Sequence, residues 1–501
     1  MDHVVVDGGP LTPGQVISVT EGAPVALAPD LASRMAPARQ VVERAIESDE
    51  VVYGITTGFG ALAATHIGRD QLETLQVNLL RSHATGVGQP LPDGLVRAML
   101  LLRARTLAQG HSGVRPVIVE HLVDMLNRGI LPLVPSQGSV GASGDLAPFA
   151  HLALPLIGEG TVRVNGLVTT PGEAGLKPLH LEAKEGLSLL NGTEGMTAMG
   201  VIALHSARQL ALAADIGTAL SVEALLGSAR PFLPEVHQLR PHPGQIESAR
   251  RVSAMLAGSP IVESHRHDFD HAVQDAYSLR CAPQVHGAVS DTLDHLETVL
   301  SREMGSVVDN PIVFPASGEV ISGGNFHGQP LAFALDFATI AVAELGSISE
   351  RRTDRMLDPA RSQGLPAFLS PDPGVNSGYM ISQYVQAALV AENRVLAHPA
   401  SVDSIPTSGS QEDHVSMGWG AGKKLLTVLD NVRRVLAIEI LCGVQGIEYR
   451  SPLVSSPANL RVVELVRSVV PRLTVDRSLS AEIDTVADLI GDGSLAGAAG
   501  V

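Results

Sequence analysis

The segment Gly141–Asp145 contains the residue types that a backbone cyclisation needs. If the amide nitrogen of Gly144 attacks the carbonyl carbon of Ala142, a five-membered ring closes. Loss of water then converts Ser143 into a dehydroalanine with an electrophilic methylidene carbon. Glycine permits the sharp bend, and a helix beginning just after the loop would stabilise negative charge on the ring. Taken alone, the segment is far more typical of a flexible turn before a helix, because short motifs recur by chance.

Other polar residues have the chemistry to bind an amino acid. Tyr277 and Arg280 lie three residues apart, so on a helical turn they would share a face. An arginine suits a carboxylate because its fork donates two parallel hydrogen bonds, although a surface ion pair would also explain Arg280. Tyr53 begins a segment with three glycines, Tyr53–Gly60, which predicts a flexible loop. Tyrosine is a weak base unless its surroundings lower its pKa, and Tyr53 alone could be an ordinary loop aromatic.

The elements around these residues are predicted to be mixed in the first part of the chain. Short strands are expected at Val4–Val6 and Val16–Val19, and a hairpin turn at Asn165-Gly166. Asp30 is expected to cap the first helix. Helices are predicted at 30–48, at 69–83, at 92–109 and between Pro116 and Gly129.

After Asn191 the sequence predicts mostly long helices. We expect them near 194–227, 283–304, 330–361, 374–397 and 420–447. The predicted fold is therefore mainly α. A mixed N-terminal domain, residues 1–190, carries the glycine-rich loops, and a helical bundle domain follows at 191–501.

Composition limits the classes of function. Apolar residues make up 45% and charged residues 17% of the 501 residues, which is typical of a globular protein. The net charge of −17 argues against nucleic acid and against an anionic membrane as partners. Cys281 and Cys442 suit a reducing cytoplasm, and the N-terminus has no signal-peptide pattern. The apolar stretches at 201–227 and 331–346 contain charges and are interpreted as buried bundle helices.

Seven ordered sequence blocks change the interpretation of the tripeptide. Together they resemble the aromatic amino acid ammonia-lyase family, which forms 4-methylidene-imidazol-5-one (MIO) autocatalytically from Ala-Ser-Gly. The blocks are Tyr53–Gly60, Gly138–Pro148, Leu190–Thr193, Gln274–Cys281, Asp309–Pro311, Gly323–Gly328 and Gln411–Gly418. The resemblance implies the fold of that family, a long-helix bundle of the fumarase/aspartase-like type. It also implies a homotetramer whose active sites draw residues from more than one chain.

The substrate within this family is indicated by Ser82-His83 and Glu412. These residues resemble the pattern of members that act on histidine, whereas lyases for phenylalanine or tyrosine usually carry an apolar or His-Leu pair and a glutamine there. An imidazole needs polar partners, and a phenyl ring would leave His83 and Glu412 buried and unpaired. Apart from the resemblance, His83 could simply end a helix and Glu412 could be a surface carboxylate.

The resemblance implies roles for particular side chains. Tyr53 would act as an acid or base on a mobile loop, Arg280 would bind the substrate carboxylate, and Asn191 would lie beside the prosthetic ring; Phe326 would contact substrate or ring, or else pack in the core. The implied catalytic residues are Tyr53, Ala142, Ser143, Gly144, Tyr277 and Glu412. The implied substrate-binding residues are His83, Asn191, Gln274, Arg280, Asn310 and Phe326. Two positions depart from the family pattern, with Thr56 in place of the usual Asn and Glu194 in place of Gln or Asp.

The implied reaction is elimination of ammonia from L-histidine to give trans-urocanate, the first step of histidine degradation. The substrate amine would add to the methylidene carbon derived from Ser143, and either Tyr53 or Glu412 would remove the β-proton. An aminomutase with the same prosthetic group and a tyrosine or phenylalanine lyase are the nearest alternatives. A non-catalytic helical assembly is a further alternative, which the intact blocks argue against.

A group of acidic and histidine residues offers a different kind of site. Its spacing matches no zinc motif, so we interpret it as a solvated loop and predict no metal. The alternative is a metal hydrolase, which a chelator would inhibit. The members of the group are Glu263, His265, His267, Asp268, Asp270 and His271.

Overall fold

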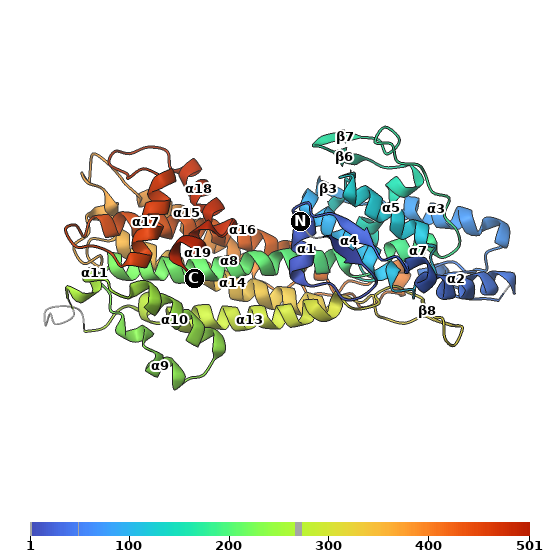
Figure 1. Ribbon diagram of the computed structural model, residues 1–501, viewed down its shortest axis with the longest axis horizontal. Coiled ribbons are helices and arrows are strands. Elements are labelled where there is room, and N and C mark those ends of the chain that lie inside the picture. The colour runs from blue at the N-terminus through green and yellow to red at the C-terminus, as the bar shows by residue number, and fades with distance from the viewer. Residues whose placement is uncertain (1–2, 49, 266–272) are drawn as a thin grey trace. The chain divides into compact units, whose positions relative to one another are not determined.

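The computed structural model describes residues 3–48, 50–265 and 273–501, and the chain in it forms two compact units. The first unit comprises 1–202, 297–335 and 399–423, and the second comprises 203–296, 336–398 and 424–501. The division falls within four long helices, which are labelled in Figure 1. These are α8 (Glu194–Ala224), α13 (Ala282–Glu303), α14 (Gln329–Leu357) and α16 (Gly418–Glu448).

The first unit combines helices with short strands. Its helices are α1 (Pro13–Thr20), α2 (Leu31–Glu47), α3 (Leu72–His83), α4 (Asp93–Ala108), α5 (Pro116–Asn127), α6 (Leu146–Ala153) and α7 (Glu185–Leu190), with 3₁₀ turns η1 (Gly60–Leu62), η2 (Arg69–Gln71), η3 (Leu154–Ile157) and η6 (Ser408–Ser410). Its strands are β1 (Val4–Val6), β2 (Val25–Leu27), β3 (Val87–Pro90), β4 (Leu131–Pro132), β5 (Pro135–Gln137), β6 (Val162–Val164), β7 (Leu167–Thr169), β8 (Ile312–Phe314) and β9 (Glu319–Ile321).

The strands form small sheets that fix the ends of loops. Strands β1 and β2 pair in parallel, with Val4 opposite Val25, and β3 pairs antiparallel with β5. Strands β4, β6 and β7 form an antiparallel sheet, and β8 pairs with β9. The pairing of β3 with β5 anchors the start of the glycine-rich loop at 138–145, and α6 fixes its end.

The second unit is helical in the residues that the structure describes. It contains η4 (Arg230–Phe232), α9 (Pro234–Gln238), α10 (Pro243–Leu256), α11 (Pro260–Glu263), α12 (Tyr277–Arg280), η5 (Ala367–Leu369), α15 (Met380–Leu396), α17 (Pro457–Val469), α18 (Ser480–Gly491) and α19 (Ser494–Ala499). Its core includes a buried ion pair, in which Arg352 donates to both carboxylate oxygens of Glu439 and both side chains have no exposed surface.

The predicted mainly helical class is confirmed, and most predicted helices begin and end within a few residues of the observed ones. The hairpin turn is also confirmed, because Asn165 and Gly166 both have positive φ, 49° and 80°. The sequence domains 1–190 and 191–501 are a division along the chain, whereas the compact units follow spatial proximity; the sequence domains stay a prediction.

The strand predicted at Val16–Val19 is wrong. These residues belong to α1, where Thr12 accepts a hydrogen bond from the amide of Gln15 and the Gln15 side chain bonds back to Thr12. This capping box, followed by Pro13 in the first turn, starts a helix. Val16 and Val19 lie three residues apart and are both buried, which is the spacing of a helical face.

Two smaller predictions also need correction. The helix predicted at 374–397 begins only at Met380, because the residues before it form turns. Asp30 precedes α2 as predicted, but its carboxylate makes no capping bond and instead pairs with Arg34 at 2.8 Å. The prolyl residue inside α2, Pro37, does not end the helix.

Within the described residues, α14 is the one helix long and apolar enough to cross a membrane by length and composition. Just over half of its most apolar window, 56%, is buried inside the protein. Asp336 within this helix pairs with Lys424 at 2.9 Å, and Glu350 is also buried. These charges fit the prediction that 331–346 belongs to a bundle helix.

Candidate active site

The tripeptide Ala142-Ser143-Gly144 lies in the loop between β5 and α6, and its backbone has the bend that cyclisation requires. Gly144 has a φ of +75°, a conformation that favours glycine. A Cβ atom on Gly144 would lie 2.0 Å from the carbonyl oxygen of Gly192, so no larger residue fits. The residues present therefore fit a ring formed from this tripeptide, because the attacking residue is both turned and closely confined.

Asn191 and Gly192 lie directly against this loop. Gly192 forms a parallel β-bridge with Gly144, and its carbonyl accepts a hydrogen bond from the amide of Asp145 at 2.9 Å. Asn191 is almost fully buried, and its side-chain amide donates to the carbonyl of Asn310 at 2.9 Å. Asn191 therefore directly precedes the glycine that bridges to the tripeptide, and its position beside the prosthetic ring stays a prediction.

Asp145 has an unusual environment for a carboxylate. It is fully buried and accepts hydrogen bonds from the Ser139 hydroxyl at 2.8 Å and from the Met196 amide at 2.9 Å. Burial raises its pKa to about 7, and these hydrogen bonds offset only part of the shift. Asp145 thus ties both ends of the loop to α8, at whose first turn Met196 lies.

Glu412 contacts the serine of the tripeptide. The Ser143 hydroxyl donates to Oε1 of Glu412 at 3.0 Å, and the Thr407 hydroxyl donates to Oε2 at 2.6 Å. Thr407 and Glu412 also pair through their backbones, so the turn between them is held at both ends. This turn aims the carboxylate at the tripeptide, across 269 residues of sequence.

His83 ends α3 and lies within electrostatic range of Glu412. Its Nδ1 bonds to the carbonyl of Leu79 at 2.9 Å. Because a carbonyl only accepts, Nδ1 carries the proton, and Nε2 of the neutral ring is left as an acceptor. Burial lowers the pKa of His83, although the bond to Leu79 and the charge of Glu412 oppose that shift. Burial therefore favours the neutral ring, in which Nε2 can accept a hydrogen bond.

The Tyr53 loop packs against the segments that carry the other site residues. A Cβ on Gly54 would contact Leu187 of α7 at 2.8 Å and Pro311 at 2.9 Å. At its far end, a Cβ on Gly60 would contact the Ser408 hydroxyl at 2.8 Å, in the turn before Glu412. The Tyr53 hydroxyl accepts from the Gly60 amide at 3.4 Å, which holds it over its own loop.

Asn310 and Phe326 lie on either side of the β8–β9 hairpin. Asn310 is 6% exposed, and its side-chain oxygen accepts from the Gly323 amide at 2.8 Å. Phe326 is partly buried, and it precedes His327, whose ring stacks on that of His414 at a centroid distance of 5.9 Å. The stacked rings of His327 and His414 therefore connect the segment after the β8–β9 hairpin to the segment that carries Glu412.

The remaining predicted site residues, Gln274, Tyr277 and Arg280, belong to the second unit. Tyr277 and Arg280 form the short helix α12, and the guanidinium of Arg280 lies over the Tyr277 ring at 4.5 Å, which confirms the predicted shared face. The Tyr277 side chain is 71% exposed. The guanidinium also donates from Nε to the carbonyl of Asp275 at 3.0 Å, which fixes its direction.

Comparison with known proteins decides the family. The model of the aromatic amino acid lyases matches residues 11–468. The chain belongs to the aromatic amino acid lyase family. It is 51% identical over 500 residues to a histidine ammonia-lyase of Gloeobacter violaceus, and the match covers 99% of this chain and 97% of that protein. The family predicted from the seven sequence blocks is therefore confirmed.

Solved structures of the family have the same fold. The crystal structure of histidine ammonia-lyase from Trypanosoma cruzi superposes with a TM-score of 0.91 at 42% identity, covering 100% of this chain and 95% of that one. A tyrosine aminomutase from Streptomyces globisporus gives 0.93 at 41% identity, covering 99% and 98%. These matches confirm the predicted lyase fold.

The structure adds buried charges that sequence reasoning did not assign to this family's site. Arg103 has no exposed surface and pairs with Glu194 at 2.8 Å, while Lys184 pairs with Asp309 at 2.9 Å. Arg103 follows Leu100, Leu101 and Leu102 in the sequence, and a charge within such an apolar run of a helix is the signal that could have found it. Both pairs adjoin the segments of Asn191 and Asn310.

Most of the acidic and histidine group proposed as a loop lies outside the described residues. His267, Asp268, Asp270 and His271 fall in 266–272. Glu263 ends α11, and His265 bonds from Nε2 to the carbonyl of Gly227 at 3.1 Å. Across the part of the chain that the structure describes, no three His, Cys, Asp or Glu side chains form a group able to hold a metal.

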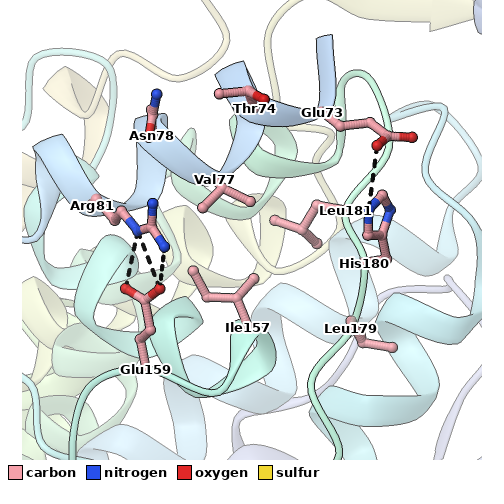
Figure 2. Close-up of a pocket in the computed structure, with 10 residues that line it drawn as sticks. All are labelled: Glu73, Thr74, Val77, Asn78, Arg81, Ile157, Glu159, Leu179, His180 and Leu181. Atoms are coloured by element: carbon pink, nitrogen blue, oxygen red, sulfur yellow. Dashed lines mark hydrogen bonds and ion pairs between the residues drawn. The ribbon is translucent and has the colours of Figure 1, made fainter. Parts of the chain in front are cut away.

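A surface hollow of about 320 Å³ lies beside α3, with Val77, Ile157 and Leu181 as its apolar floor (Figure 2). Arg81 bonds to Glu159 across one side of it, and His180 pairs with Glu73 across another. Its charged side chains therefore already satisfy one another. The hollow contains none of the predicted site residues.

Proposed function

We propose that this chain catalyses the non-oxidative elimination of ammonia from L-histidine to give trans-urocanate, the first step of histidine degradation. The observation that carries the proposal is the contact of the Ser143 hydroxyl with Glu412, 3.0 Å long, with neutral His83 in range of the same carboxylate. The support is an acidic group in contact with the tripeptide and a histidine ring within electrostatic range of that carboxylate. Relatives about 50% identical over nearly the whole chain bear the name histidine ammonia-lyase.

We propose 4-methylidene-imidazol-5-one, formed from Ala142, Ser143 and Gly144, as the prosthetic group. The support from this chain is the turned and confined backbone at Gly144, and the family uses such a ring. When present, the group supplies an electrophilic carbon that converts the substrate amine into a better leaving group. The need for it is chemical, because the β-hydrogens of histidine are barely acidic and its amine leaves poorly.

The chain's own residues would bind and orient the substrate. His83 and Glu412 would hydrogen-bond the imidazole, and Arg280 would hold the carboxylate as a two-pronged donor. Asn191, Asn310, Gln274 and Phe326 would line the site. Tyr53 or Glu412 would remove the β-proton, and Tyr277 would assist the proton transfer. Of the two candidate bases, Glu412 already accepts a hydrogen bond from Ser143, and Tyr53 lies on a loop that packs against the turn of Glu412.

We propose a homotetramer whose active sites combine residues of different chains. Two features support it. Gln274 and Tyr277 are exposed in the isolated chain. Helix α14 exposes Phe333, Phe337 and Ile340, at 58%, 49% and 43%, at the spacing of one helical face. Such a run of exposed apolar side chains is typical of a surface that another subunit covers. Free Cys281 and Cys442 suit the cytoplasm as its compartment.

A tyrosine aminomutase is among the most similar solved structures, so a 2,3-aminomutase is the second candidate. Lyases for tyrosine or phenylalanine are weaker candidates, because Ser82, His83 and Glu412 differ from the residues usual in those lyases. The ring of phenylalanine would also leave the Nε2 acceptor of His83 unpaired.

The test is incubation of the purified protein with L-histidine, L-tyrosine and L-phenylalanine in parallel, with detection in the near ultraviolet and chromatography of the products. Urocanate from histidine alone supports the proposal. β-Histidine as the main product would identify an aminomutase, and turnover of tyrosine or phenylalanine in preference to histidine would contradict the substrate assignment.

A further inference from the structure

Arg103 binds both ends of the 188–194 segment, whose Gly192 contacts Gly144 of the tripeptide. It lies in α4 with no exposed side-chain surface. Its Nη1 donates to the carbonyl of Ser188 at 3.1 Å and to that of Asn191 at 2.5 Å, and its Nη2 donates to Glu194 at 2.8 Å. Ser188 belongs to α7, Asn191 directly follows that helix, and Glu194 begins α8. One side chain therefore clamps the residues before and after Gly192.

The same guanidinium also contacts the helix that follows the tripeptide. It lies over the ring of Phe149 at 4.4 Å, in a cation–π arrangement. Phe149 belongs to the first turn and a half of α6, and its amide donates to the carbonyl of Asp145 at 3.1 Å. Arg103 is thus packed between the 188–194 segment and the helix that fixes the end of the ring-forming loop.

Gly192 is confined between this ion pair and Gly144. A Cβ on Gly192 would lie 2.2 Å from Oε2 of Glu194 and 2.7 Å from Nη2 of Arg103. On its other side, Gly192 forms a β-bridge with Gly144. A Cβ on Gly144 would lie 2.0 Å from the carbonyl oxygen of Gly192. The Arg103–Glu194 pair therefore backs the glycine that limits how far the backbone of Gly144 can relax.

We propose that Arg103, backed by Glu194, is a positioning residue for formation of the prosthetic ring. The inference rests on the proposed function, and it concerns maturation of the chain rather than turnover. Ring closure joins the Gly144 nitrogen to the Ala142 carbonyl carbon. One water leaves with the Ala142 oxygen and the amide hydrogens of Ser143 and Gly144; a second leaves with the Ser143 hydroxyl and its Cα hydrogen. This closure needs the reacting atoms held close together, and Arg103 supplies the rigid support.

An arginine suits this task better than a lysine. Its planar fork reaches two carbonyls and one carboxylate at once, whereas an ammonium is a single point of charge on a flexible stem. Glu194 neutralises the buried guanidinium, which would otherwise be costly to bury. The family's usual Gln or Asp at this position could also accept a hydrogen bond from the guanidinium, so the clamp tolerates the departure found at Glu194.

The test measures the intact mass of denatured full-length chains, purified after expression for equal times. The variants are Arg103→Lys, the double variant Arg103→Met/Glu194→Gln, which removes both buried charges together, and Arg105→Met as the matched control. Arg105 is buried in the same helix at 2% exposure, but its hydrogen bonds go to the carbonyls of Gly9 and Ser306 rather than to the 188–194 segment. Thermal unfolding and size-exclusion chromatography identify the folded fraction of each protein.

We expect the wild type and Arg105→Met to lack two waters in nearly all folded chains. In the folded double variant, most chains should retain both waters. In folded Arg103→Lys, an intermediate fraction of the chains should retain them. Full dehydration of both Arg103 variants would overturn the proposal. If the double variant does not fold, the mass of Arg103→Lys alone tests the proposal. Loss of two waters from all folded Arg103→Lys chains would then overturn it. A wild type that retains both waters would overturn the ring itself, and this proposal with it.

Discussion

The Ser143 hydroxyl donates a hydrogen bond to the Glu412 carboxylate, Oγ to Oε1, over 3.0 Å. The contact joins the loop before α6 to the turn after η6, and Thr407 fixes the other carboxylate oxygen. A carboxylate in this position can hydrogen-bond an imidazole and exchange a proton with a substrate bound at the tripeptide. Ser143, the proposed precursor of the electrophile, and Glu412, a proposed acid/base residue, are therefore paired within one compact unit.

Replacing Glu412 with Gln should lower kcat for L-histidine by about 10²- to 10⁴-fold, the usual contribution of a positioned acid or base. Glutamine keeps the size and one acceptor, so the fold should survive. The assay is initial-rate formation of urocanate. Asp413→Asn, an exposed neighbour in the same turn, is the control and should keep its activity. An unchanged kcat for Glu412→Gln would remove this residue from the proton-transfer step.

Thr56 should support the Tyr53 loop through its hydroxyl. This hydroxyl donates to the Glu50 carbonyl at 2.6 Å and accepts from the Val52 amide at 2.9 Å, and the residue is 2% exposed. Thr56→Val removes both hydrogen bonds, at a cost of about 0.5–1.5 kcal/mol for each. We expect faster proteolytic cleavage within 50–60 and a lower kcat, whereas Thr56→Ser should behave as wild type. Equal cleavage rates for Val and Ser would show that the hydroxyl does not hold the loop.

Lys184 and Asp309 form an ion pair without any exposed side-chain surface. Removing one charge leaves the other buried and unpaired, so Lys184→Met should lower the free energy of unfolding by roughly 3–5 kcal/mol. The double variant Lys184→Met/Asp309→Asn should recover part of this loss. Denaturant unfolding of the wild type, of Lys184→Met, of Asp309→Asn and of the double variant measures it. A double variant less stable than the sum of both single changes would contradict the pairing.

Asp145 should make the protein less stable as the pH rises from about 4 to about 7. Burial raises its pKa from 3.8 to about 7, so in this range the folded chain keeps a proton that the unfolded chain has lost. The favourable contribution is therefore complete below the unfolded pKa and is lost as the pH rises through the folded pKa. Asp145→Asn removes this dependence on pH. The difference in unfolding free energy between variant and wild type should therefore change with pH, by about 1.4 kcal/mol for each unit of pKa shift and by a few kcal/mol at most. Unfolding at pH 5 and pH 8 measures it, and a difference that does not depend on pH would contradict the assignment.

The long helices were predictable because periodic apolar residues and glycine or proline boundaries specify them locally. Helix α1 is harder to predict, because two valines three residues apart suit a short strand as well as a helix, and the capping box of Thr12 and Gln15 is what starts the helix. Compact units could not be predicted from sequence alone, because 297–335 and 399–423 join the first unit through packing rather than through chain order.

Candidate site residues came mainly from the resemblance, since Tyr53, His83 and Glu412 are individually unremarkable in the sequence. The structure adds their relations, above all the pairing of Ser143 with Glu412 and the bridge between Gly144 and Gly192. The clamp of Arg103 was not predictable, because its partners Ser188, Asn191 and Glu194 are 85 to 91 residues away in the chain.

The central claim is that the tripeptide around Ser143 generates the electrophile that makes histidine lose ammonia. Its most direct test is the rate of urocanate formation from L-histidine by the wild type and by Ser143→Ala at equal concentration. The claim predicts steady formation by the wild type and a loss on the order of a thousand-fold or more in the variant, which lacks the hydroxyl that must leave. A Ser143→Ala protein that kept the full wild-type rate would contradict it.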